Sequence, residues 1–167
     1  MIRTALVERW LVIVLVVGVG LYELFHAVFD GLQYMVNVEF VGIVLSMDST
    51  TEPDSWRAID SPVIAFLAYT LIWAAHASSG ALCLIGSYQL TTTVAGSDSS
   101  FRERSAAATL GVGIGCVLYL VGFLAIASGW FLLYTAPTPP NFIPNAIRLF
   151  LCYVAVLIYL SIIGRSR

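Results

Sequence analysis

The side chains best suited to chemistry are Glu23, His26 and Asp30, which follow one another at intervals of three and four residues in an otherwise apolar stretch. An α-helix carries residues at these intervals on one face. Carboxylates and imidazoles suit copper, zinc or iron, so Glu23, His26 and Asp30 are candidate metal ligands. His76 can join His26 and Asp30 in a mononuclear site, and His26 and His76 are candidate cofactor residues as the axial ligands of haem b.

The segment Glu23-Leu-Phe-His26 has the Glu-x-x-His spacing of dinuclear carboxylate sites. Such sites use the motif twice and add a glutamate from each of two further helices. Here the motif occurs once, and no other predicted span contains a glutamate. A complete two-metal site is therefore disfavoured.

A structural role for the same residues is favoured over ligand binding. With a rise of about 1.5 Å per residue and each span centred on the bilayer midplane, His76 lies near the midplane, Glu23 roughly 5 Å and His26 roughly 10 Å outward. Glu23 and His76 are then neighbours that satisfy each other's polar groups. One haem could join His26 and His76 only if the register differed by about two helical turns. We therefore expect no cofactor, with haem b or a metal ion as the alternative.

The elements that position these residues are membrane spans. Of the 167 residues, 59% are hydrophobic and 11% charged, which is far from the composition of soluble proteins. Four apolar runs are long enough to cross a bilayer, at about 9–31, 62–90, 106–134 and 145–164. The sequence predicts an all-α membrane protein with a single four-helix transmembrane domain over residues 1–167 and an interfacial segment in the first outer loop.

The distribution of arginine predicts the orientation. All eight basic residues are arginine, and no basic run of the kind that nucleic-acid binding requires is present, so nucleic acid is not an expected partner. The positive-inside tendency places both termini in the cytoplasm. Six arginines fall on the side of the termini and the middle loop, and two fall on the other side: Arg3, Arg9, Arg102, Arg104, Arg165 and Arg167 against Arg57 and Arg148.

The first outer loop begins with an apolar segment, residues 35–45, that is too short and too polar to span. It is expected to lie in the membrane interface, as a helix in preference to a strand. Residues 46–60 are acidic and rich in turn formers, and their carboxylates are expected to be solvated. Asp60 or Ser61 followed by Pro62 predicts the cap and first turn of the second span.

The third span carries a stripe of small residues at Ala107, Gly111, Gly115 and Gly122, which suits close helix packing in lipid. Packing within the protein is favoured over a partner site. The loop at 91–104 is predicted to be a flexible polar turn, and the proline-rich segment at 135–146 a rigid connection.

The segments VLSMDSTTEPDSWRAIDSP (44–62), SGWFLLYTAP and NAIRLFLCYVAVLIYL resemble the bacterial family of predicted small integral membrane proteins of unknown function. The resemblance runs in order from about residue 23 onward. It implies four helices and a bacterial inner (cytoplasmic) membrane location, and it implies no activity. His26 and His76 depart from the family pattern, because other polar residues are usual at those positions. Claudin-like proteins share the architecture, but they carry a cysteine pair in the first loop, which is lacking here.

No catalytic triad, phosphate-binding glycine loop or thiol nucleophile pattern occurs in the sequence. We therefore expect a non-enzymatic accessory or stabilising subunit that contacts the lipid bilayer and packs against a larger membrane complex, respiratory, photosynthetic or transport. The alternative is a haem- or metal-binding membrane redox protein that uses Glu23, His26 and His76. Translocation of a small molecule or proton ranks last, because the third and fourth spans supply almost no polar path.

Overall fold

The computed structural model describes residues 2–137 and 142–163, and within them the chain is helical and contains no strand. Its long helices are α1 (Ile2–Leu32), α3 (Pro62–Thr92), α5 (Ala106–Val117) continued by η1 (Leu118–Trp130), and α6 (Phe142–Ile163). Four segments of this part are long and apolar enough to span a bilayer: Thr4–Leu32, Pro62–Thr92, Ala106–Trp130 and Phe142–Ile163. The predicted fold class is confirmed.

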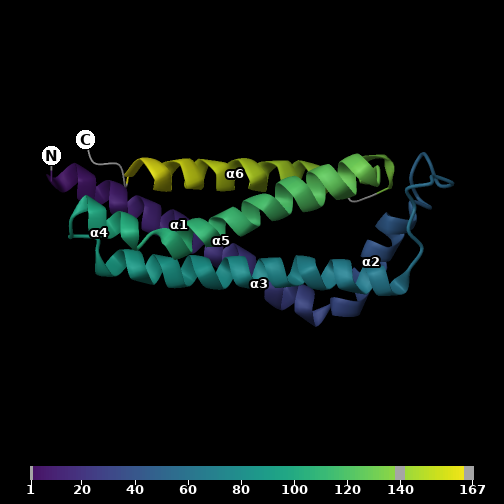
Figure 1. Cartoon of the computed structure of the whole chain (residues 1–167), viewed down its shortest axis with the longest axis horizontal. Coiled ribbons are helices and arrows are strands. Elements are labelled where there is room, and N and C mark those ends of the chain that lie inside the picture. Colours follow the sequence, from purple (N-terminus) through teal and green to yellow (C-terminus); the bar gives the residue numbers. More distant parts are fainter. Residues whose placement is uncertain (1, 138–141, 164–167) are drawn as a thin grey trace.

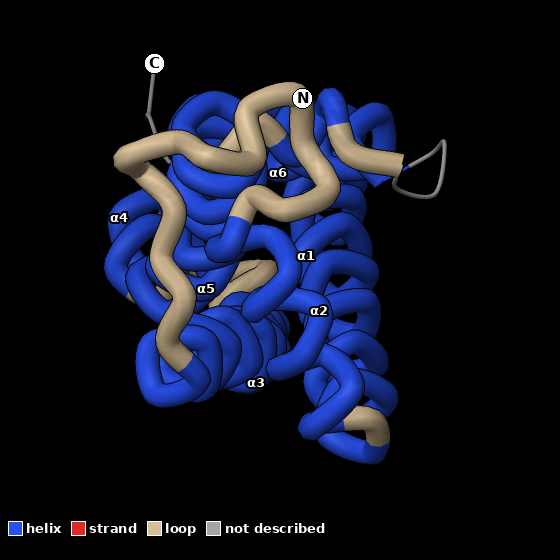
Figure 2. The backbone as a smooth tube through the Cα atoms, turned by 90° about the vertical axis from the view of Figure 1, so that its right-hand side faces the viewer, coloured by secondary structure: helices blue, strands red, loops and turns tan. Residues whose placement is uncertain are grey.

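The four spans lie lengthwise beside one another, with α1 packed across α3 and α5 with η1 between α3 and α6 (Figure 1). The first turns of α1, the last turns of α6 and the short helix α4 (Asp98–Glu103) gather at one end. The connection at 47–61 covers the other end and is the tan segment nearest the viewer in Figure 2. The two ends of the bundle therefore carry the two sets of loops that the arginine distribution separates. Arg165 and Arg167 of that distribution lie outside the described residues.

The apolar segment of the first loop is the helix α2 (Tyr34–Ser46), as expected. It packs along the N-terminal half of α3, where the Tyr34 hydroxyl lies 2.6 Å from Thr70 Oγ1. Met47 ends α2 in the left-handed conformation with φ 60°. Ser61 caps α3, because its side chain accepts a hydrogen bond from the Ile64 N–H and Pro62 occupies the first turn. The predicted start of the second span is confirmed.

The third span differs from the single α-helix predicted over 106–134. Its second half, η1, is a π-helix of 13 residues, and the helix ends at Trp130. Leu132 then adopts φ 53°, and the 3₁₀ turn η2 (Leu133–Thr135) follows. Each turn of a π-helix holds more residues than an α-turn, so every side chain after Leu118 is rotated from its expected face. Apolar periodicity does not signal this change, because η1 is apolar on nearly all sides.

Small residues do allow close packing, at two of the four predicted positions. A Cβ added to Gly111 would lie 2.7 Å from Cys83 N and 2.9 Å from Ser79 O, so α5 and α3 are in backbone contact there. A Cβ on Gly115 would run into the ring of Tyr153 on α6. Ala108, and not Ala107, is the fully buried alanine, and it faces Gly86. Gly122 meets only Leu118 of its own helix.

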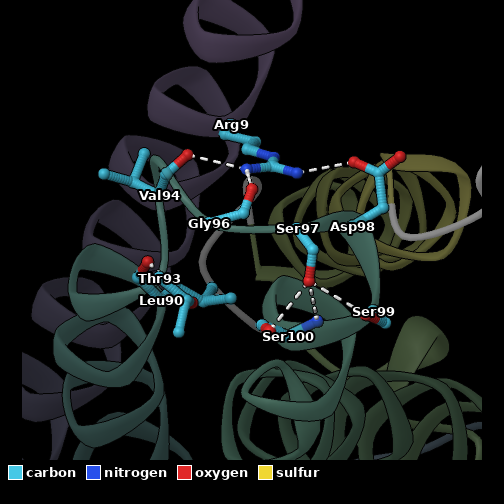
Figure 3. Close-up of polar contacts among 9 residues, drawn as sticks. All are labelled: Arg9, Leu90, Thr93, Val94, Gly96, Ser97, Asp98, Ser99 and Ser100. Carbon is cyan, nitrogen blue, oxygen red and sulfur yellow. Dashed lines mark hydrogen bonds and ion pairs between the residues drawn. The ribbon is translucent and has the colours of Figure 1, made fainter.

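Arg9 contacts the loop at 91–104, which the sequence predicts to be a flexible polar turn. The guanidinium of Arg9 donates to Val94 O at 2.8 Å and Gly96 O at 2.7 Å, and pairs with Asp98 Oδ1 at 2.5 Å (Figure 3). It also lies over the Phe101 ring, 4.9 Å from its centroid. Ser97 caps α4 by accepting from the Ser100 N–H. Arg9, which the sequence analysis used to orient α1, therefore also binds α1 to the loop.

Candidate functional site

Glu23 lies at the centre of the bundle, with 0% of its surface exposed. Its Oε2 lies 2.6 Å from His76 Nδ1 on α3, and its Oε1 accepts from the Tyr153 hydroxyl on α6 at 2.5 Å. A buried carboxylate is stable only when such donors replace water. The expected pairing of Glu23 with His76 is confirmed, and Tyr153 adds a third helix to it. We call Glu23, His76 and Tyr153 the buried triad.

His26 stacks on His76, with ring centroids 5.3 Å apart and an interplanar angle of 21°. The prediction that two helical turns separate these residues was wrong, because the midpoints of α1 and α3 are staggered along the bundle. The C-terminal end of α1 lies beside Trp73 and Tyr69, whose side chains donate to the carbonyl oxygens of Ala27 and Asp30. The first turn of α3 extends beyond that point, and its Ala65 faces Gly42 of α2.

Asp30 lies beside His26, with Oδ2 3.9 Å from Nδ1. Glu23 faces His76 instead. The polar residues of α1 therefore take part in two separate pairs, Glu23 with His76 and Asp30 with His26. Across residues 2–137 and 142–163, no three His, Cys, Asp or Glu side chains are arranged to hold one metal ion. The proposed ligand set of Glu23, His26 and Asp30 does not converge in this arrangement.

The stacked rings also bear on the haem hypothesis. Two axial histidines must approach the iron from opposite faces of the porphyrin, each through a ring nitrogen. His26 and His76 instead lie ring against ring at 5.3 Å, which leaves no room for a macrocycle between them. One ring nitrogen of His76, Nδ1, already forms a hydrogen bond with Glu23. This arrangement does not fit a haem held between the two histidines.

A cavity of about 260 Å³ opens beside the stacked histidines. Polar side chains from several helices line it, among them His26 and Asp30 from α1, Asn37 from α2, His76 from α3 and Asn145 from α6. Asn37 also donates to the Tyr69 hydroxyl at 2.9 Å. We call this space the polar cavity. It combines hydrogen-bonding groups with a size that holds a small ring or headgroup.

Aromatic rings form one wall of the polar cavity. Tyr119 of η1 lies edge-on to both His76 and Tyr153, with centroids 6.2 Å and 5.5 Å away. Phe123 stacks on Tyr119 at 5.6 Å and contacts Phe142 of α6. The π-helical winding of η1 sets the positions of Tyr119 and Phe123, since both lie within it. π-helical segments occur frequently at functional sites.

A second, larger space adjoins the first. It has a volume of about 630 Å³, lies between α2, α3, α5 and η1, and is lined entirely by apolar side chains and glycine. We call it the apolar groove. The two spaces share five lining residues, which are Phe40, Val41, Ile72, Phe123 and Phe142.

The sequence analysis missed Tyr119 and Tyr153. Each stands alone in an apolar run, where a tyrosine is as readily a packing residue as a hydrogen-bond donor. The signal that points to Tyr153 is indirect: a buried glutamate accepts more than one hydrogen bond, and His76 faces it through Nδ1 alone. No comparable signal points to Tyr119.

No curated protein and no solved structure matches the chain. A model of the family described as predicted small integral membrane protein (DUF2165) matches residues 8–163, which include all four spans, the buried triad and both cavities. The chain therefore belongs to this family of small integral membrane proteins of unknown function, as the resemblance implied.

Proposed function

We propose that this protein is a non-enzymatic binding protein of the membrane interior, which receives the polar end of a membrane-soluble molecule in the polar cavity. The observation that carries the proposal is the polar cavity itself, lined by His26, Asp30 and His76 and situated between spanning helices. Ionisable side chains are costly inside a membrane and mark sites of function there. A concave site with a few convergent polar groups is the usual form of a ligand site.

The buried triad supports this role because it fixes the position of His76, which lines the polar cavity. Among the residues that the structure describes, no buried side-chain nitrogen or oxygen lacks a hydrogen-bond partner. Both carboxylate oxygens of Glu23 are hydrogen-bonded, one to His76 and one to Tyr153. Glu23 therefore holds His76 in position, and His26 stacks on one face of the His76 ring. Groups whose rotamers are fixed by such bonds bind a ligand with little loss of entropy.

Extraction of the bound molecule tests the proposal. The protein is purified from its own membrane in a mild detergent and denatured in organic solvent, and the extract is analysed by mass spectrometry. We expect one small molecule at close to one copy per chain. The His26→Leu variant should lose it, because the change removes a polar wall of the cavity. Glu39→Leu, an equally polar-to-apolar change at an exposed position of α2 outside both cavities, should retain it.

An accessory role in a larger membrane complex is the second candidate. Trp56 of the outer connection is 84% exposed and packs edge-on against Trp130, which is 48% exposed, at 5.8 Å. Exposed tryptophans are typical of protein interfaces, although tryptophan also anchors proteins at the bilayer surface. The proposed location is the bacterial inner membrane, with the end that carries α4 in the cytoplasm.

Native sizing distinguishes the two candidates. If the protein is a subunit of a complex, a second protein should co-migrate with it in constant ratio. That protein should be lost in Trp56→Ser and retained in Trp10→Ser, which removes a tryptophan of 46% exposure from α1. Migration as the chain alone, in both variants and in the parent, would contradict the accessory role.

A further inference from the structure

The polar cavity and the apolar groove adjoin each other. They share the side chains of Phe40, Phe123 and Phe142, among others. The ring of Phe142 on α6 contacts both Phe40 on α2 and Phe123 on η1. In each pair the ring centroids are 5.7 Å apart. A molecule with its head at His26 and its tail in the groove would lie across this aromatic boundary.

The charges around the polar cavity exclude a strongly anionic head. Within residues 2–137 and 142–163 no arginine lines it, and the sequence contains no lysine. Asp30 contributes a carboxylate instead, so a phosphate there would meet a like charge. Arg148 donates to Asn145 Oδ1 at 3.2 Å at the rim but does not line the cavity. A head of low net charge fits these surroundings best.

The shape and chemistry of the walls favour a flat head with hydrogen-bond acceptors. Tyr119 and Phe123 present a stacked aromatic wall, and aromatic side chains pack best against another flat ring. Imidazole and amide groups of His26 and Asn145 line the same space and can donate to ring carbonyl oxygens. The groove beyond is lined only by apolar residues, which suits a hydrocarbon tail.

We propose that the ligand is a quinone that bears a long apolar tail, with its ring in the polar cavity beside His26 and Tyr119 and its tail in the apolar groove. This inference rests on the proposed function, since it names the class of molecule that the site binds. It assigns binding only and involves no transfer of electrons.

Two glycines provide a matched pair of variants. Gly113 lines the apolar groove, and a Cβ added there would meet no atom within 4 Å, so leucine at this position enters the groove without disturbing the helices. Gly18 of α1 has the same open surroundings but lines neither cavity. Gly122→Leu is a second groove variant, because its Cβ would meet only Leu118 Cδ1 at 3.4 Å.

The experiment titrates the full chain, stripped of lipid in detergent, and counts bound molecules by native mass spectrometry. The probes are a benzoquinone with a decyl tail, the same quinone without a tail, phosphatidylglycerol and an alkyl trimethylammonium ion. We expect saturable binding of one decyl quinone per chain. The tailless quinone should bind at least about tenfold more weakly, because each buried methylene adds to the affinity. Gly113→Leu and Gly122→Leu should weaken decyl quinone binding by a similar factor, and Gly18→Leu should leave it unchanged.

The outcomes separate this inference from the proposed function. Saturable binding of phosphatidylglycerol or the ammonium ion, sensitive to Gly113→Leu, with no binding of the decyl quinone, would overturn the quinone assignment and leave a ligand site in place. Absence of binding by all four probes, together with an empty organic extract from the native protein, would overturn both. Equal effects of Gly113→Leu and Gly18→Leu would contradict the placement of the tail in the groove.

Discussion

Tyr153→Phe tests the buried triad with the smallest possible change, the removal of one hydroxyl. Tyr153 is 2% exposed and Glu23 is fully buried, so no water replaces the lost donor at Glu23 Oε1. Hydrogen bonds between membrane helices contribute about 0.6 kcal/mol on average. A buried polar group left without a partner costs about 1–3 kcal/mol, and more when it is charged. The full burial of Glu23 places this case in the higher range, so we expect a loss of about 1–3 kcal/mol.

The assay is unfolding of the purified chain in mixed micelles of increasing sodium dodecyl sulfate, followed by circular dichroism. Tyr159→Phe is the matched control, because its hydroxyl makes only a long 3.5 Å bond to Glu8 O near the surface. We expect this control to change the free energy of unfolding by no more than about 0.5 kcal/mol. Glu23→Gln should also be milder than Glu23→Leu, because an amide can still bond to both neighbours. Equal stabilities for Tyr153→Phe and Tyr159→Phe would refute the reasoning.

Three further predictions follow from other parts of the molecule. Arg9→Ala removes the contacts to Val94 O, Gly96 O and Asp98, so backbone amides of α4 should exchange with deuterium faster. Arg104→Ala, at the exposed end of the same helix, should leave their exchange unchanged. Identical exchange in both variants would show that Arg9 does not order the loop. Replacing Gly111 and Gly115 together by leucine should lower the midpoint of unfolding sharply, because the added side chains overlap Cys83 and Tyr153. Gly113→Leu should leave the midpoint nearly unchanged. An unchanged midpoint in the double variant would rule out close packing of α5. In a variant without the native cysteines, a membrane-impermeant maleimide should label Thr51→Cys from outside intact cells and Ser99→Cys only after permeabilisation, and the reverse pattern would invert the proposed orientation.

The spans and the pairing of Glu23 with His76 could be predicted because both depend on local rules. Apolar runs of sufficient length identify spans, and two ionisable groups on neighbouring spans have few other ways to be satisfied in lipid. The cap at Ser61 likewise follows from residues adjacent in the sequence.

The position of His26 and the form of the third span could not be predicted in the same way. His26 reaches His76 because α3 extends outward past α1 and packs there on α2, a tertiary shift that span lengths do not encode. The π-helical winding of η1 arises in a segment that is apolar all round, so the sequence has no polar stripe from which to read its period. Arg9 was assigned to a membrane boundary by its charge, and its bonds to the loop depend on the folded path of residues 94–98.

The most direct test of the central claim is an experimental structure of the chain purified from its own membrane with its native lipids. The account predicts density for one flat molecule in the polar cavity, against His26 and Tyr119, with a tail that runs past Phe123 into the apolar groove. A polar cavity without such a molecule, or a bound molecule whose tail lies outside the apolar groove, would contradict it.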